Sequence, residues 1–473
     1  MSEQLSAHPH VRSWTRHSLP CLLVFAVVLA ARLFYVESYA VSLPFWDQWD
    51  AEGAQLILPY EKGTLPLEQL WAAHNEHRIL PTRLTFLALY LITGEWNNLH
   101  GAYFNAFLCA ALAALLVWVP TRTLTRPAVR WLTAAVAAAS FSLPFAYENI
   151  LVGFQSQFYY LVLFTVAASA LAAWRPGDPK AMVAVFMASS AAVLTMASGM
   201  LTPIAAAGVY MLARYSNRTR MPATEIAMVL VLLALAILSY STTPVMEGHR
   251  ELMAVDAREI VDASTHMLGF PADGYHWTFL WLWLPGVCGL LVRVHRRDLE
   301  VSDFIMASLL GWSGVQAIAV AYGRGHGLVE VTSRYTELMT PGLVASTWFI
   351  VRALELGWRS EAMRLVTAIG CAGSLAIFAT GHVVRFEGDM RYMEERHALT
   401  GIQIYNVRRY LITGDTAALN QPRLHIPHYN PGRLQTLLDD EVLRATLPLE
   451  IWNPGTLPSR NATPETPARD ARK

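Results

Sequence analysis

The chain has 473 residues, and its 36 basic and 36 acidic side chains give a formal net charge of +0. Hydrophobic residues make up 54% and charged residues 15%, whereas soluble proteins carry about 25% charge. These values exclude a soluble enzyme, a disordered chain and a basic nucleic-acid-binding protein. They predict an all-α protein that crosses the lipid bilayer several times.

Membrane-crossing helices need about 20 mostly apolar residues, and about eleven segments meet this requirement. In chain order they are 19–39, 100–120, 131–147, 154–173, 181–198, 200–214, 224–241, 276–294, 303–322, 338–356 and 364–382. Residues 1–382 are therefore predicted to form a transmembrane domain. The polar tail, 383–473, is predicted to be a separate region that is disordered from about residue 453, where proline is frequent.

Arginine positions predict the orientation, because cytoplasmic loops of membrane proteins are enriched in Arg and Lys. The clusters fall in alternate loops when the N-terminus is cytoplasmic and residues 79–94 do not cross. That segment contains Pro81 and Arg83, and we expect it to lie flat on the outer surface as an amphipathic helix. The clusters are Arg12/Arg16, Arg122/Arg126/Arg130, Arg175/Lys180, Arg214/Arg218/Arg220, Arg293/Arg296/Arg297 and Arg352/Arg359/Arg364.

This topology predicts a multi-pass protein of the inner (plasma) membrane with an extracytoplasmic C-terminal tail. The first helix is interpreted as retained, although Ser38-Tyr39-Ala40 matches a signal-peptide cleavage site. Three outer loops result, at about 40–99, 242–275 and 323–337.

The first outer loop opens with SLPFWDQWD, which holds Asp47 and Asp50 with Trp46 and Trp49. On a helical turn the two carboxylates share one face and the two indoles share the adjacent one. Carboxylates beside aromatic rings suit a sugar, because hydroxyls donate to carboxylates and the C–H faces stack on rings. The alternative is a solvated acid pair beside ordinary interfacial tryptophans.

The loop continues with AAHNEHRILPTR, where five polar residues follow one another from His74 to Arg78. The four candidates for substrate binding among them are His74, Glu76, His77 and Arg78. Together with the acid pair they form a candidate substrate-binding surface directly before the predicted flat helix.

The order of these parts resembles the GT-C superfamily of membrane glycosyltransferases, which includes protein O-mannosyltransferases and aminoarabinose transferases. The matching parts are Asp47/Asp50, HNEHRILPTRL, LITGEW, the crossing to RTLTR and the helix pair TMASGMLTPIAAAGVYML. His-Asn-Glu-His replaces the family's His-Pro-Pro segment, and Pro203 stands where many members have lysine. The resemblance covers about the first 215 residues and is one of topology and loop chemistry.

The resemblance implies an inverting transfer of a sugar from a polyprenyl-phosphate donor to a glycan, lipid or protein acceptor outside the membrane. An acidic residue deprotonates the acceptor hydroxyl, and cations stabilise the departing phosphate. Asp47 is our candidate base, and Asp50 is its candidate partner or a metal ligand. The sequence fits the opposite assignment of the two aspartates almost equally well. No nucleotide cofactor is expected, because phosphate-binding glycine loops are absent from the sequence.

Arginine in the short third outer loop, AYGRGHGLVEVTSRYTELMTPG, runs against the positive-inside trend. Arg334 and Tyr335, followed by Arg324, are therefore candidate ligands of the donor phosphate. The alternative is a surface pair between arginine and glutamate.

Further candidates lie in FAYENILVGFQSQFYY, where Glu148 and Gln155 stand at the outer end of a helix pair. A divalent metal is left open, with Asp47, Asp50 and Glu148 as possible ligands and His74 or Glu76 beside them. The second outer loop holds another set with unconvincing spacing, namely His249, Asp256, Asp262 and His266.

Two other functions remain as alternatives. A transporter or flippase of lipid-linked glycans places ionisable residues at mid-membrane and shows paired broken helices, whereas the acids here concentrate outside. An O-antigen-type polymerase or ligase has a large late outer loop with paired arginines, whereas the loop 323–337 is short.

Overall fold

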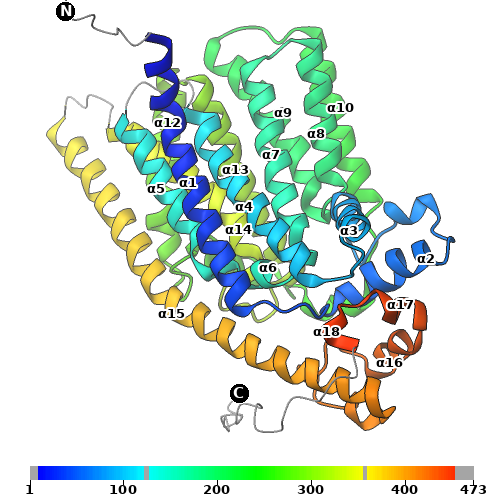
Figure 1. Cartoon of the computed structure of the whole chain (residues 1–473). Coiled ribbons are helices and arrows are strands. Elements are labelled where there is room, and N and C mark those ends of the chain that lie inside the picture. The colour runs from blue at the N-terminus through cyan, green and yellow to red at the C-terminus, as the bar shows by residue number, and fades with distance from the viewer. Residues whose placement is uncertain (1–8, 122–126, 355–359, 453–473) are drawn as a thin grey trace, which may run out of the picture.

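The computed structural model describes residues 9–121, 127–354 and 360–452 (Figure 1). Every regular element in these ranges is a helix, and the one β-type pairing is an isolated bridge between His74 and His77. The predicted all-α class is confirmed. The predicted disorder from about residue 453 lies outside the described residues.

Within the described ranges, eight segments are long and apolar enough to cross a membrane, which confirms that the protein is suited to a bilayer. The first, Ser18–Tyr39, is the greater part of α1 (Pro9–Tyr39). The others contain α4 (Asn98–Thr121), α5 (Pro127–Ser142) with α6 (Tyr147–Leu151), α7 (Ser156–Trp174), α10 (Ala223–Ser241), α12 (Thr278–Arg296), α13 (Val301–Arg324) and α15 (Glu361–Thr413).

The other three predicted spans also form helices, but they are not among those eight. Two of them, α8 (Pro179–Val193) and α9 (Leu201–Asn217), have 15 and 17 residues and are short for a crossing. The third, α14 (Thr336–Leu354), has 19 residues, of which several are polar. The count of eleven therefore stays a prediction.

The polar residues of α14 are compatible with its place at the centre of the bundle. Nearly all of its residues are buried, and it packs against α13, α12 and α5. A helix that is surrounded by protein contacts no lipid, so its polar groups need partners on neighbouring helices. Glu337, near its start, finds such partners beneath the site described below.

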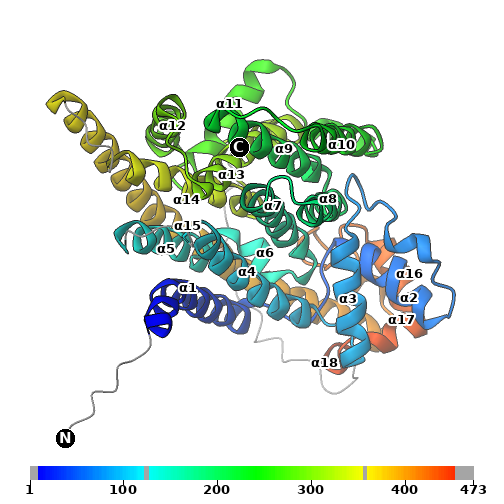
Figure 2. The same cartoon turned by 90° about the horizontal axis from the view of Figure 1, so that it is seen from above.

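Residues 79–94, predicted to form a helix that does not cross, fold as α3 (Leu80–Thr93). Its 14 residues are few for a crossing. The helix runs crosswise to the bundle: Figure 1 shows it nearly end-on and Figure 2 shows it lengthwise. Gly94 ends it with a φ of 73°, a conformation that glycine adopts without steric cost. Before it, the first outer loop forms the short helices α2 (Leu58–Glu61), η1 (Trp49–Ile57) and η2 (Leu67–Leu70).

The last predicted span and the start of the predicted tail belong to one helix, because α15 continues without a break to Thr413. The chain then turns at Gly414 and folds back in α16 (Pro431–Asp439), α17 (Glu441–Thr446) and α18 (Leu449–Trp452). We call residues 414–452 the C-terminal cap. Figure 1 shows the cap, in red, beside the first outer loop, in blue.

The cap and the first outer loop share a hydrophobic core that is separate from the core of the bundle. Trp49 and Trp96 meet edge to face there, with ring centroids 5.1 Å apart. Leu434, Leu438 and Leu443 of the cap are fully buried against the same cluster. Burial of these side chains holds the polar end of the chain on the outer-loop side of the bundle.

Candidate functional site

A cavity of about 390 Å³ lies where the first outer loop meets α6, the segment just before α14 and the middle of α15. Its lining residues are Phe45, Trp46, Asp47, Tyr147, Glu148, Leu151, Val152, Phe154, Gln155, Arg334, Tyr392, Glu395, Arg396, Leu399 and Leu424. Three clusters that the sequence places in separate loops thus come together at one site.

Asp47 stands in the cavity wall with 43% of its side chain exposed. The loop positions Asp47 through Trp46, which has a left-handed φ of 48° and donates its backbone N–H to the Pro427 carbonyl of the cap at 2.6 Å. His74 Nε2 lies 3.8 Å from Asp47 Oδ1, which is close enough for attraction but long for a hydrogen bond. Burial opposes ionisation of Asp47, yet His74 and Arg334 outweigh it and lower the pKa of the carboxyl. Asp47 is therefore ionised at neutral pH.

Arg334, from the segment just before α14, and Glu148, from α6, form a contact in the cavity wall. Arg334 Nη2 lies 3.3 Å from Glu148 Oε1, and both side chains are partly exposed. Ser333 Oγ donates to Glu148 Oε2 at 2.6 Å, so the carboxylate is held on both sides. Burial opposes the charge of Arg334, but Glu148 and other neighbours outweigh it and raise the pKa of the guanidinium. Arg334 thus presents a permanent positive charge to the cavity.

Beneath this pair, a buried ion pair joins α1 to α14. Arg32 Nη2 donates to Glu337 Oε1 at 2.9 Å, and both side chains are at most 3% exposed. Arg32 also donates to the Phe141 carbonyl and to Tyr159. Asn149 connects the pair to the cavity, since its Nδ2 donates to Glu337 Oε2 at 2.8 Å and to the Arg334 carbonyl at 3.0 Å. The floor of the site is therefore a hydrogen-bonded polar network inside the bundle.

Asp50 does not line the cavity, although it is only three residues from Asp47. His428 Nε2 lies 3.0 Å from Asp50 Oδ2, and Arg433 Nε donates to Oδ1 at 2.9 Å. The His428 contact, together with Arg433, lowers the pKa of Asp50 to about 2 despite partial burial. We call Asp50, His428 and Arg433 the clamp, because they tie the first outer loop to the C-terminal cap.

The four candidates of the second loop motif separate from one another. His74 stays beside Asp47, and Glu76 instead pairs with Arg324 and with His249 Nδ1, the latter at 3.0 Å. His77 accepts a hydrogen bond from Ala197 N at 3.2 Å, and burial lowers its pKa to about 4. This group joins three outer segments at a place away from the cavity lining.

Several other predicted site residues have structural partners instead of facing the cavity. Arg78 is bonded to the carbonyls of Trp71 and Thr242 on the exposed surface. The ring of Tyr335 packs edge to face on Phe158, with centroids 6.1 Å apart. Trp49 is fully buried, and its Nε1 donates to the Pro44 carbonyl at 2.9 Å.

The predicted residues that do line the cavity are Trp46, Asp47, Glu148, Gln155 and Arg334. A shared metal site of Asp47, Asp50 and Glu148 does not assemble in the structure, because both carboxylate oxygens of Asp50 are held by the clamp.

The middle of α15 supplies cavity residues that the sequence analysis missed. The guanidinium of Arg396 lies 3.4 Å from the centroid of the Phe45 ring, and Tyr392 stacks on Tyr147 with centroids 6.0 Å apart. Residues 361–413 contain no proline, which is the signal that the helix continues past residue 382. That continuation brings a second arginine and another aromatic ring to the cavity.

The cavity therefore combines an ionised carboxylate, two arginines and a wall of aromatic rings. Such a set can accept a proton from a hydroxyl, bind an anion and stack on an apolar face. No protein-family model matches the chain, and no curated protein matches it.

Proposed function

We propose that the protein is an integral membrane glycosyltransferase. It moves a sugar from a polyprenyl-phosphate donor to an acceptor hydroxyl on the outer side of the membrane. The observation that supports this proposal best is the meeting of Asp47, Arg334 and the aromatic wall in one cavity above an apolar helical bundle.

In this proposal Asp47 is the general base. Its carboxylate takes the proton of the acceptor hydroxyl as that oxygen attacks the anomeric carbon and the bond from this carbon to the phosphate oxygen breaks. The attack comes from the face opposite the phosphate, so the anomeric configuration inverts. A carboxylate that is ionised at neutral pH and partly exposed is suited to this role.

Arg334 is the proposed ligand of the donor phosphate, and Arg396 supports it from α15. Guanidinium groups bind phosphate through paired N–H donors, and they stabilise the negative charge that builds up on the leaving group. Glu148 orients Arg334 through their 3.3 Å contact. The rings of Trp46 and Tyr392 line the same cavity, and we assign them to stacking on the sugar.

One observation favours the alternative of a transporter for lipid-linked glycans. The Arg32–Glu337 pair lies inside the bundle, where ionisable residues often mark a transport path. Its hydrogen bonds to Phe141, Asn149 and Tyr159 satisfy the pair internally, however. This arrangement favours a structural role below the cavity.

The test compares Asp47→Asn with Asp50→Asn in the full-length protein. The purified proteins are placed in lipid vesicles with a radiolabelled pool of polyprenyl-phosphate sugars and extracted membrane acceptors. We expect Asp47→Asn to lower the rate of transfer by about 10²–10⁴-fold, the usual contribution of a general base. Asp50→Asn should keep most of the activity per folded molecule.

Three outcomes contradict the proposal. The first is wild-type activity in folded Asp47→Asn, and the second is a larger loss in Asp50→Asn than in Asp47→Asn. The third is movement of labelled lipid across the vesicle membrane without any transfer to acceptor, which would favour the transporter.

A further inference from the structure

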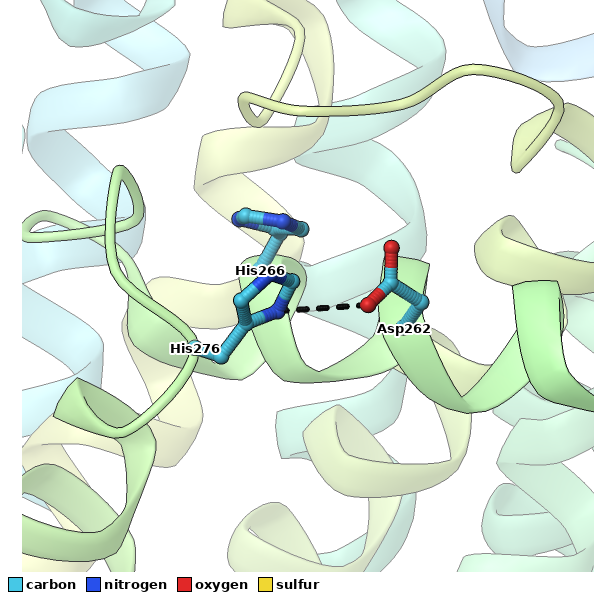
Figure 3. A group of neighbouring side chains, drawn as sticks. All are labelled: Asp262, His266 and His276. Atoms are coloured by element: carbon cyan, nitrogen blue, oxygen red, sulfur yellow. Dashed lines mark ion pairs between the residues drawn. The ribbon is translucent and has the colours of Figure 1, made fainter.

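A second group of polar side chains, separate from the cavity, lies around α11 (Ala257–Gly269). Asp262 and His266 are four residues apart on this helix and therefore share a face. His276 reaches the same place from the segment between α11 and α12, as Figure 3 shows. Each of the three residues offers one ligand atom, and these atoms lie within 4.8 Å of one another.

The imidazole of His266 is oriented in the way that metal-binding histidines usually are. It is 5% exposed, and its Nδ1 lies 2.5 Å from the carbonyl oxygen of Asp273. A carbonyl only accepts hydrogen bonds, so Nδ1 carries the proton and the lone pair is on Nε2. Metal-bound histidines commonly donate their second ring N–H to a backbone carbonyl or a carboxylate, which sets the tautomer and the ring orientation.

The backbone that supplies this carbonyl is held independently of the histidines. Asp273 Oδ2 accepts hydrogen bonds from Val331 N at 2.6 Å and from Arg385 Nη1 at 2.7 Å. Thr278 Oγ1 donates to the Ala272 carbonyl at 2.8 Å, which pins the turn at the start of α12. The support of His266 is thus rigid before any ligand arrives.

The other two ligands are exposed and adaptable. Asp262 and His276 have side chains that are 56% and 58% exposed, and His276 Nδ1 lies 3.3 Å from Asp262 Oδ1. Ligand atoms in a tetrahedral site with bonds of about 2.0–2.1 Å are about 3.3 Å apart. Small rotations of these two exposed side chains therefore close the group around an ion that is fixed by the buried His266.

We propose that Asp262, His266 and His276 bind a divalent transition-metal ion of the zinc class. Two imidazoles and one carboxylate are a ligand set that zinc and its neighbours accept, whereas calcium and magnesium prefer oxygen ligands alone. Three protein ligands leave a fourth position for water. The ion links α11 to the segment before α12, and it requires nothing of the sugar-transfer chemistry proposed for the cavity.

The same helix provides a matched comparison for an ordinary surface ion pair. His326 Nδ1 lies 3.0 Å from Glu259 Oε1 of α11, and the His326 side chain is 54% exposed. This pair has the same chemistry as His276 with Asp262, but no third ligand of the metal-binding type accompanies it among the described residues. Substitution of His326 therefore controls for loss of an exposed histidine.

The experiment uses the full-length protein in lipid nanodiscs, purified through a tag that contains no histidine. Co²⁺ is titrated, its visible absorption bands report the coordination, and Zn²⁺ is then added as competitor. We expect one Co²⁺ per chain, displaced by Zn²⁺ and released as the imidazoles protonate at acid pH. His276→Asn and Asp262→Asn should each weaken Co²⁺ affinity by more than about tenfold, whereas His326→Asn should leave it unchanged.

Two results overturn the metal site. One is equal Co²⁺ affinity in the wild type and in His276→Asn. The other is an equal loss in His326→Asn, which would indicate unspecific binding to surface histidines. Both substituted residues of the main test are exposed, so the fold should survive, and thermal unfolding checks this. Donor and acceptor are absent from the measurement, so failure of the metal site leaves the proposed transferase function untouched.

Discussion

Asp47 and Asp50 belong to one short sequence motif, yet they lie in two different regions of the molecule. Asp47 faces the cavity, and its Oδ1 lies 3.8 Å from Nε2 of His74. Asp50 faces the C-terminal cap and is held at 2.9–3.0 Å by Arg433 and His428. The carboxylate of Asp47 is available to a ligand, whereas both oxygens of Asp50 already have protein partners.

The difference shows that two carboxylates within one turn of the chain can have different environments. One is presented to a cavity, and the other holds two segments of the protein together. A loosely partnered carboxylate keeps oxygen lone pairs that a substrate can use. A carboxylate with two close cationic partners instead contributes to stability, and its removal affects the contact between loop and cap. Four substitutions test whether the cavity and the clamp differ in this way.

The largest effect is expected below the cavity, at Glu337→Gln. This change leaves the guanidinium of Arg32 buried without its counter-charge, and breaking a buried pair costs about 3–5 kcal/mol. Unfolding of the purified protein by a denaturing detergent measures the loss. The control is Glu330→Gln at an exposed position, where a change within about 0.5 kcal/mol is expected. Equal stability of the two variants would contradict the structural role of the pair.

The next effect is on activity, at Arg334→Gln. If Arg334 binds the donor phosphate, its loss should slow sugar transfer by about 10²–10³-fold, the usual effect of removing one charge-stabilising donor. Arg324→Gln is the matched control, because Arg324 pairs with Glu76 away from the cavity. Transfer rates per folded molecule are compared. A larger loss of transfer rate in Arg324→Gln than in Arg334→Gln would indicate that Arg324 binds the phosphate, and it would contradict the role proposed for Arg334.

A smaller effect on stability is expected from breaking the clamp with Asp50→Asn. The lowered pKa of Asp50, about 2 against an ordinary 3.8, corresponds to about 1–2 kcal/mol after allowance for partial exposure. Because the pKa is lower in the folded state, this contribution is present above pH 4 and is lost as the pH falls towards 2.

The measurement is the difference in unfolding free energy between the wild type and Asp50→Asn as a function of pH. The two curves should run apart at neutral pH and converge on acidification. A difference that stays constant down to pH 3 would indicate that the ionised carboxylate is not the stabilising group.

The smallest effect is expected at Lys62→Ala. Lys62 Nζ donates to Asp440 Oδ2 at 2.7 Å between the first outer loop and the cap, but the lysine side chain is 44% exposed. Exposed pairs contribute at most about 1 kcal/mol and weaken with salt. Unfolding at low and high ionic strength measures the difference, which should shrink as salt is added. A loss larger than that of Asp50→Asn would mean that the clamp is not the main polar link to the cap.

The sequence alone determined the class of the protein and much of its organisation. Apolar runs of about 20 residues are incompatible with a soluble fold, because lipid is the only solvent that accepts so many of them. Arginine positions distinguished the short segment that became α3 from the predicted crossing helices. The polar residues of the outer loops were recognisable because charge near a membrane needs a reason.

Only the tertiary structure decided which of those polar residues meet. Asp50 and His428 are 378 positions apart, and no local pattern indicates that they pair. Helical periodicity assigns residues to faces of one element, whereas Arg396 reaches the cavity because α15 is long and packs beneath the first outer loop. Arg324 and Tyr335, which were predicted to belong to the site, do not line the cavity, because packing brings other partners to them. Neighbours in sequence are only some of the partners that a side chain meets in the folded protein.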